Sequence, residues 1–397
     1  MRRFLAVVCL MVLLCGCGAP NPETTAPMQT MVPETTVPET TVPPTTEAPD
    51  PVLVLLEGMT LRQKVGQLFL IRPEALTGGE PERTWVTEAM TAALERYPVG
   101  GFVLFAENIN DGAQLAVFNA SLREASVIAP FLAVDEEGGR VARLANHSAF
   151  DLPQYRSAAS VGSSGDYRDA LRMGDAIGGY LRQYGFNLDF APVADVNTNP
   201  DNPVIGNRAF SSDPEVAARM AGSMADGLRQ QGIVPTFKHF PGHGDTAEDS
   251  HAGLAVTYKT EAEMSECEWL PFLEAGPLEC VMVAHVAAPE LTGDMTPATM
   301  SYHMVTEILK EQLGFRGLVI TDALEMGAVT NDYTSGQAAL AALNAGCDLL
   351  LMPEDLFGAF EAVVIAVENG EYPEEKLDET VLKILKFKLD SGILDAG

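Results

Sequence analysis

Basic residues are scarce in this chain. Its 397 residues include 25 lysines and arginines against 55 aspartates and glutamates, which gives a formal net charge of −30 at pH 7. Proteins that bind nucleic acid do so through clustered positive charge, so this composition argues strongly against nucleic acid as a partner. A neutral ligand, such as a sugar, is compatible with this composition.

Cysteines and nucleotide-binding motifs are also lacking. Of the six cysteines, only Cys267, Cys280 and Cys347 follow the first 17 positions, and an odd number implies no disulfide framework. No G-x-G-x-x-G, Walker or G-x-S-x-G pattern is present, so nucleotide use and serine hydrolysis have no support. No cofactor is expected.

The apolar run at the N-terminus, Phe4–Leu14, is too short to be a stable membrane-spanning helix. It follows the basic start Met1-Arg2-Arg3, as in an export signal. Leu14-Cys15-Gly16-Cys17 resembles a bacterial lipobox, with cleavage before Cys17 and lipidation of that cysteine. Residues 1–17 are therefore predicted to be a lipoprotein signal peptide that anchors the protein at the extracellular face of the bacterial membrane. A secretory signal without lipid and an uncleaved anchor stay open, because Cys15 is unusual at its position.

Residues 18–51 are rich in proline, threonine and glutamate and contain few large apolar side chains. Such a tract cannot bury a core, so it is predicted to be a disordered linker. A single domain is then expected over residues 52–397.

Eight short apolar runs alternate with helix-length amphipathic segments in that domain. They are Gln67–Ile71, Gly101–Phe105, Phe131–Val134, Asn187–Ala191, Val234–Phe237, Cys280–Ala284, Leu318–Thr321 and Asp348–Met352. Buried parallel strands have this composition, and eight of them alternating with helices predict an α/β fold, a single (β/α)8 barrel. Such barrels carry their active sites at the C-terminal ends of the strands.

Helix-end signals fit this alternation. Ser211–Glu215 predicts a helix start and a helix that continues to about Gln231. Pro373-Glu374-Glu375 predicts a last helix through about Leu389, and Gly346 is expected as a left-handed C-cap before the eighth strand.

The segment Lys238–His251 concentrates three of the six histidines with a lysine and three acids. A strand is expected to end before it and to deliver Lys238 and His239 into a loop. A zinc site is disfavoured because prolines and glycines interrupt the spacing of the histidines, and a polar loop with structural histidines stays open. An acid/base site accounts best for the segment, since Asp249 could orient and charge His251. No metal is expected.

The motifs K-H-F-P-G-H-G, which begins at Lys238, and D-S-H, residues 249–251, resemble the signature of glycoside hydrolase family 3, in its β-N-acetylglucosaminidase branch. The resemblance implies that His251 is the general acid/base and that Asp249 is its partner. It also implies that Lys238 and His239 bind the substrate.

Three further segments are similar to the same family. The segment Asp135–Arg143 resembles the sugar-binding loop of the family, which implies that Asp135 and Arg143 bind hydroxyls of the sugar. The segment Asn207–Phe210 resembles another binding element, which implies that Arg208 also binds the sugar. Ile320–Met326 resembles the nucleophile segment, with the nucleophile at Asp322.

Asp322 is also the first charge after a buried strand, where a carboxylate is costly unless it is solvated or used. A helix N-cap at Asp322 is the structural alternative.

These features together predict a retaining exo-β-N-acetylglucosaminidase that releases GlcNAc from peptidoglycan fragments or related glycosides through a covalent glycosyl-enzyme. A monomer is expected. Two alternatives stay open: a phosphorylase, in which phosphate replaces water at the same site, and a non-catalytic sugar-binding lipoprotein. A β-glucosidase is disfavoured because that branch lacks the D-S-H element.

Overall fold

The computed structural model describes residues 50–79, 83–247 and 253–395. The predicted signal peptide with Cys17, and the predicted linker as far as residue 49, lie outside these ranges. Helix α1 (Pro51–Gly58) begins one residue before the expected domain start, and the Asp50 side chain accepts a hydrogen bond from the Val52 N–H at 2.9 Å. Within the described ranges no helix is both long and apolar enough to cross a membrane.

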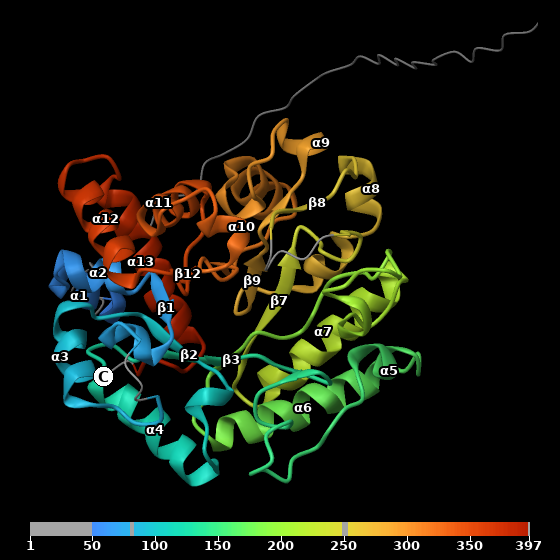
Figure 1. Cartoon of the computed structure of the whole chain (residues 1–397), viewed down its shortest axis with the longest axis horizontal. Coiled ribbons are helices and arrows are strands. Elements are labelled where there is room, and N and C mark those ends of the chain that lie inside the picture. The colour runs from blue at the N-terminus through green and yellow to red at the C-terminus, as the bar shows by residue number, and fades with distance from the viewer. Residues whose placement is uncertain (1–49, 80–82, 248–252, 396–397) are drawn as a thin grey trace, which may run out of the picture. The chain divides into compact units, whose positions relative to one another are not determined.

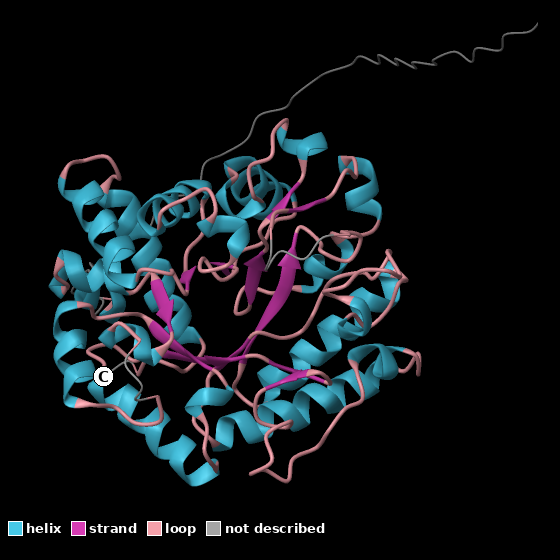
Figure 2. Cartoon of the chain, viewed as in Figure 1, coloured by secondary structure: helices cyan, strands magenta, loops and turns pink. Residues whose placement is uncertain are grey.

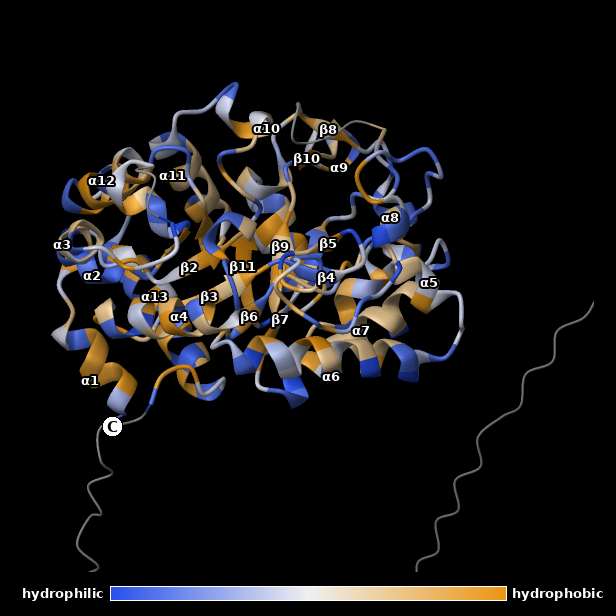
Figure 3. Cartoon of the chain, turned by 60° about the horizontal axis from the view of Figure 1, so that its bottom comes forward, coloured by the Kyte–Doolittle hydropathy of each residue, from blue (hydrophilic) through white to orange (hydrophobic). Residues whose placement is uncertain are grey.

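Eight buried strands form the central sheet, and each lies in or contains one of the predicted apolar runs (Figure 2). They are β1 (Phe69–Ile71), β2 (Gly101–Leu104), β3 (Phe131–Val134), β6 (Leu188–Asp189), β7 (Val234–Phe240), β9 (Cys280–Val283), β11 (Leu318–Thr321) and β12 (Leu350–Leu351). Figure 3 shows apolar residues concentrated on strands such as β9 and β11. The prediction of eight strands is confirmed.

All neighbouring strands of this sheet run parallel, in the order β11-β9-β7-β6-β3-β2-β1-β12. A parallel bridge between Ile320 in β11 and Leu349 beside β12 joins the two edges. The Thr321 N–H also donates to the Leu349 carbonyl at 3.0 Å. The sheet is therefore a nearly closed eight-stranded barrel, and helices surround it (Figure 1), as the sequence predicts.

The prediction for the end of the fifth strand is wrong in one respect. Lys238 and His239 were expected in a loop, but β7 continues through both residues to Phe240. Lys238 pairs with Met282 of β9, and the register then shifts at a bulge before Phe240 pairs with Val283. Two polar residues therefore belong to a buried strand, which is possible only because charged partners from other strands surround them.

The helices that alternate with these strands come next. They are α2 (Leu61–Gly66), α3 (Glu88–Arg96), α4 (Gly112–Ala125), α6 (Tyr167–Gln183), α7 (Pro214–Gln230), α8 (Glu261–Glu266), a π-helix (His303–Gln312), α11 (Ser335–Ala345), α12 (Leu356–Glu368) and α13 (Glu374–Asp390). Three predictions are confirmed. Asp213 caps α7 by accepting hydrogen bonds from two backbone N–H groups, Gly346 ends α11 with φ 112°, and α13 lies where the last helix was expected.

Shorter elements lie in the connections. They are α5 (Ala158–Gly162), α9 (Pro289–Thr292), α10 (Gly327–Thr330), the 3-10 turns Pro73–Thr77, Ala106–Asn108, Gly206–Arg208, Leu270–Glu274 and Ala298–Met300, and the paired short strands β4 (Glu136–Gly138) with β5 (Val141–Ala142) and β8 (Ala255–Val256) with β10 (Val286–Ala287). Buried Glu136 holds the β4–β5 hairpin, since its carboxylate accepts from the Leu144 and Ala145 N–H groups at 2.9 and 2.8 Å.

The N-terminal ends of the strands enclose a lysine. Lys388 of α13 is fully buried, and its Nζ donates to Gln67 Oε1 and to the Gly100 carbonyl, both at 2.9 Å. It lies 4.7 Å from the centre of the Phe131 ring. Burial lowers the pKa of Lys388 from 10.5 to about 7, because none of these contacts supplies a full negative charge.

This burial predicts a pH-dependent stability. Between about pH 7 and 10.5 the unfolded chain binds a proton at Lys388 that the folded chain lacks, so the native protein gains stability as the pH rises. The gain is at most about 1.4 kcal/mol per pH unit. Urea unfolding at several pH values should show that Lys388→Met removes this slope, whereas Lys386→Met, on the exposed face of the same helix, keeps it. Parallel stability curves for the native protein and Lys388→Met would contradict the assignment.

Candidate active site

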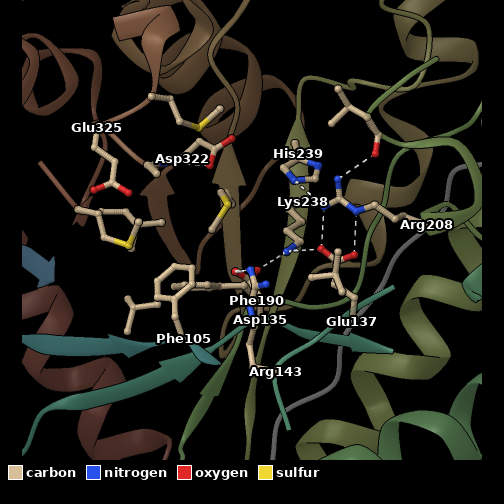
Figure 4. Close-up of a pocket in the computed structure, with 18 of the residues that line it drawn as sticks. Phe105, Asp135, Glu137, Arg143, Phe190, Arg208, Lys238, His239, Asp322 and Glu325 are labelled. Atoms are coloured by element: carbon tan, nitrogen blue, oxygen red, sulfur yellow. Dashed lines mark hydrogen bonds and ion pairs between the residues drawn. The ribbon is translucent and has the colours of Figure 1, made fainter. Parts of the chain in front are cut away.

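A cavity of about 260 Å³ opens at the C-terminal ends of the strands (Figure 4). Each of the eight strands contributes a lining residue at or directly beyond its C-terminal end: Arg72, Phe105, Asp135, Phe190, Lys238, Met282, Asp322 and Met352. These side chains line one space, so residues far apart in sequence can act on one ligand.

The centre of the polar wall is the buried Lys238. Its Nζ is 2.7 Å from Asp135 Oδ1 and 2.6 Å from Glu137 Oε1, and Arg143 Nη2 is 3.3 Å from the other Asp135 oxygen. Burial alone would lower the pKa of Lys238, but the two carboxylates raise it above its usual value. The lysine is therefore a charged hydrogen-bond donor.

Glu137 connects this lysine to Arg208. The Arg208 guanidinium binds it in a bidentate manner, with Nε 2.8 Å from Oε2 and Nη2 2.7 Å from Oε1. Although burial favours its neutral form, Arg208 and Lys238 hold the pKa of Glu137 well below its usual range. Glu137 was not singled out from the sequence, although it lies inside the Asp135–Arg143 motif.

His239 is oriented by a second buried carboxylate. Its Nδ1 is 2.7 Å from Asp195 Oδ2, and the other Asp195 oxygen accepts from the His243 N–H at 2.7 Å. Its Nδ1 carries a hydrogen, because the Asp195 carboxylate can only accept, and its Nε2 is 3.4 Å from Arg208 Nη2. Asp195 follows strand β6 by several residues, and nothing in the local sequence marked it.

Asp322 directly follows β11. Its N–H donates to the Val283 carbonyl at 2.8 Å, and its Oδ1 accepts from the Ala323 N–H at 2.8 Å. Burial favours the neutral acid, but His285, His239 and the Ala323 N–H together lower the pKa of Asp322 below its usual value. The helix N-cap alternative is wrong, because α10 begins only at Gly327.

His285 is fully buried beside this segment. Its Nε2 is 3.0 Å from the Ala323 carbonyl, which only accepts, so Nε2 carries the hydrogen. The Thr299 hydroxyl then donates to Nδ1 across 2.8 Å. Burial lowers the pKa of His285, and its hydrogen bond to the Ala323 carbonyl fixes the backbone next to Asp322.

The aromatic ring of Phe105 also lines the cavity. The guanidinium carbons of Arg72 and Arg143 lie 4.3 and 5.1 Å from the centre of the Phe105 ring. Arg72 Nη2 is also 2.7 Å from Glu325 Oε1. Arg72 and Phe105 were not singled out from the sequence, although Arg72 directly follows a predicted strand, the signal that selected Asp135, and Phe105 is the last residue of another.

Six of the residues singled out from the sequence line this one cavity: Asp135, Arg143, Arg208, Lys238, His239 and Asp322. Asp249 and His251 lie outside the described residues, as does Cys17. Within the described ranges no group of three histidine, cysteine, aspartate or glutamate side chains is placed to hold a metal ion.

Comparisons with known proteins agree with this geometry. The model of the glycosyl hydrolase family 3 N-terminal domain matches residues 60–387. Beta-hexosaminidase A of Pseudoalteromonas piscicida is 34% identical over 333 residues, which cover 77% of this chain and 56% of that protein. A beta-hexosaminidase of Xylella fastidiosa is 39% identical over 275 residues, 67% of this chain and 80% of that protein. The chain belongs to glycoside hydrolase family 3.

Solved structures support the same assignment. A family 3 beta-N-acetylglucosaminidase from Paenibacillus has a TM-score of 0.76 at 34% identity, over 84% of this chain and 63% of that one. The beta-N-acetylglucosaminidase of Thermotoga maritima has a TM-score of 0.70 at 26% identity, over 83% and 69% of the two chains. This chain therefore spans between about half and four fifths of the length of these relatives.

The charge cluster predicts a large difference between two bidentate ion pairs, one buried and one partly exposed. Glu137→Gln leaves Lys238 and Arg208 buried with one carboxylate fewer, and breaking a buried pair in this way costs about 3–5 kcal/mol. Glu361 also binds Arg62 in a bidentate manner, through Nη1 and Nη2 at 3.0 and 2.9 Å, but both side chains are 32% exposed. Glu361→Gln should cost no more than about 1 kcal/mol. Denaturant unfolding of both variants measures the difference, and equal losses would contradict it.

Proposed function

We propose that this protein is a retaining exo-β-N-acetylglucosaminidase that releases GlcNAc from peptidoglycan fragments or related β-glycosides. The observation that carries the proposal is the position of Asp322, which directly follows β11 and shares one cavity with a cluster of charged hydrogen-bonding groups. A protein that only captures sugar needs no nucleophile of this kind, which favours an enzyme over a binding lipoprotein.

The charged cluster supports recognition of a single terminal sugar. Asp135, Lys238, Arg208 and His239 present donors and acceptors on the same side of the cavity, which suits the vicinal hydroxyls of a pyranose. The volume of about 260 Å³ is below the range of roughly 300–1,000 Å³ typical of drug-sized ligands. One sugar ring is therefore the ligand that fits, which favours action at a chain end.

Two displacements account for the chemistry. Asp322 attacks the anomeric carbon, the bond to the leaving oxygen breaks, and that oxygen takes a proton from the general acid. In the second step the same group removes a proton from water, whose oxygen bonds to the anomeric carbon and displaces Asp322. The family resemblance of the D-S-H element supports His251 as the acid/base and Asp249 as its partner.

The relatives support the sugar specificity, since two solved family members are named as beta-N-acetylglucosaminidases and the curated relatives as beta-hexosaminidases. Phosphate could take the place of water in the second displacement. Assays with and without inorganic phosphate therefore separate hydrolysis from phosphorolysis by whether free GlcNAc or its 1-phosphate forms.

Asp322→Asn should abolish turnover of p-nitrophenyl GlcNAc, because the amide cannot form the glycosyl-enzyme. A 5-fluoro glycosyl inhibitor of the GlcNAc type should label the native protein on the peptide that contains Thr321-Asp322-Ala323. The free energy of unfolding of Asp322→Asn should differ from that of the native protein by no more than about 1–2 kcal/mol, the usual range for a single polar substitution. Mass spectrometry locates the label. A label on Asp245 or Asp249, or full activity of Asp322→Asn, would overturn the proposal.

A further inference from the structure

Asp245 and Thr257 lie in the chain on either side of residues 248–252, which contain the D-S-H motif and are outside the described ranges. The Thr257 hydroxyl donates to Asp245 Oδ2 at 3.0 Å, so one hydrogen bond joins the chain before the motif to the chain after it. Thr257 is buried, and the Asp245 side chain is only 16% exposed. The contact is therefore largely shielded from water.

Each of these two flanks is anchored to the barrel. Before the motif, Asn202 Nδ2 donates to the His243 and Thr246 carbonyls at 2.8 and 2.9 Å. After the motif, β8 pairs with β10, and the Thr257 N–H donates to the Ala287 carbonyl at 2.9 Å. The flanks thus rest on the segments that follow β6 and β9, and the hydrogen bond between the two side chains connects them.

Lys259 binds a second carboxylate at the same place. Its ammonium forms an ion pair with Glu268 Oε1 and lies 4.0 Å from Asp245 Oδ2. Glu268 is fully buried, and a Cβ atom at Gly242 would lie 2.6 Å from its Cγ, so Glu268 packs against the K-H-F-P-G-H-G motif. Burial raises the pKa of Glu268, Lys259 opposes this shift, and the neighbouring Asp245 carboxylate raises the pKa further. Lys259 therefore holds two acids together.

We propose that Lys259 and Thr257 are positioning residues, which fix the chain on both sides of the D-S-H motif so that His251 can act as the acid/base. The inference rests on the proposed function and on the role given there to His251. A general acid must lie within hydrogen-bond reach of the leaving oxygen, so a shift on the order of 1 Å weakens it. Neither side chain is among those that line the active-site cavity, so neither is expected to contact the sugar.

Lys259→Met and Thr257→Val should therefore impair most the substrates whose leaving oxygen needs a proton. For GlcNAc-β-1,4-GlcNAc, kcat/KM should fall about tenfold or more, part of the roughly 10²–10⁴-fold that general acid catalysis supplies. For p-nitrophenyl GlcNAc, which releases a stable phenolate, it should fall less than about threefold. Lys259→Arg keeps the charge and should recover most of the loss.

Lys310→Met is the matched control. The Lys310 side chain is 23% exposed, against 24% for Lys259, and its ammonium lies 3.2 Å from the buried Asp348. Asp348 precedes β12 and so lies at the end of the barrel away from the active site. Lys310→Met also removes a cation from a buried carboxylate, but it should change kcat/KM for both substrates by the same factor. An inactive fraction of the protein does not alter the ratio between the two substrates.

Combination with His251→Ala shows whether Lys259 acts through that histidine. In the double variant, Lys259→Met should lower kcat/KM for both substrates by the same small factor, because the group that it positions is gone. Thr257→Val removes only a hydroxyl and decides the matter alone if Lys259→Met does not fold.

An unchanged substrate ratio in Lys259→Met and Thr257→Val, the same selective loss in Lys310→Met, or a selective loss that persists without His251 would contradict the inference. If the native protein cleaves neither substrate, or if His251→Ala impairs both equally, the proposed function or its acid/base assignment fails, and the inference fails with it.

Discussion

The active-site end of the barrel depends on one buried ammonium, that of Lys238. Taking this charge out of water is costly, and Asp135 and Glu137, at 2.7 and 2.6 Å, offset the cost. Arg208 in turn requires Glu137, so strand β7, the segment after β3 and the turn that carries Arg208 must come together as one unit. The charges also act on Asp322, since Lys238 and His239 are among the groups that lower its pKa. The cluster thus shapes the cavity and lowers the pKa of Asp322.

The barrel could be predicted because its strands are buried on both faces. Such strands appear in the sequence as continuous apolar runs, and all eight were found. The extent of β7 could not be predicted in this way. Lys238 and His239 are polar, and they belong to a strand only because Asp135, Glu137 and Asp195 approach from elsewhere in the chain. A local pattern does not contain these long-range pairings.

The residues of the candidate site show the same difference between local patterns and long-range pairings. Residues that directly follow strands can be found from sequence, as Asp135 and Asp322 were and as Arg72 and Phe105 could have been. His285 directly follows the predicted run Cys280–Ala284 and could have been found as well. Asp195 could not, because it lies several residues beyond β6 and its position follows from its contact with His239 of the neighbouring strand β7. The roles assigned to Asp249 and His251 rest on their spacing in the sequence and on the family resemblance.

The central claim is that Asp322 forms a covalent bond with the sugar, which fixes the stereochemistry of the product. Proton NMR of the reaction with p-nitrophenyl β-GlcNAc, recorded before mutarotation, measures that stereochemistry directly. A double displacement releases the β-anomer of GlcNAc first. Initial appearance of the α-anomer would show a single displacement by water and would contradict the role of Asp322 as nucleophile.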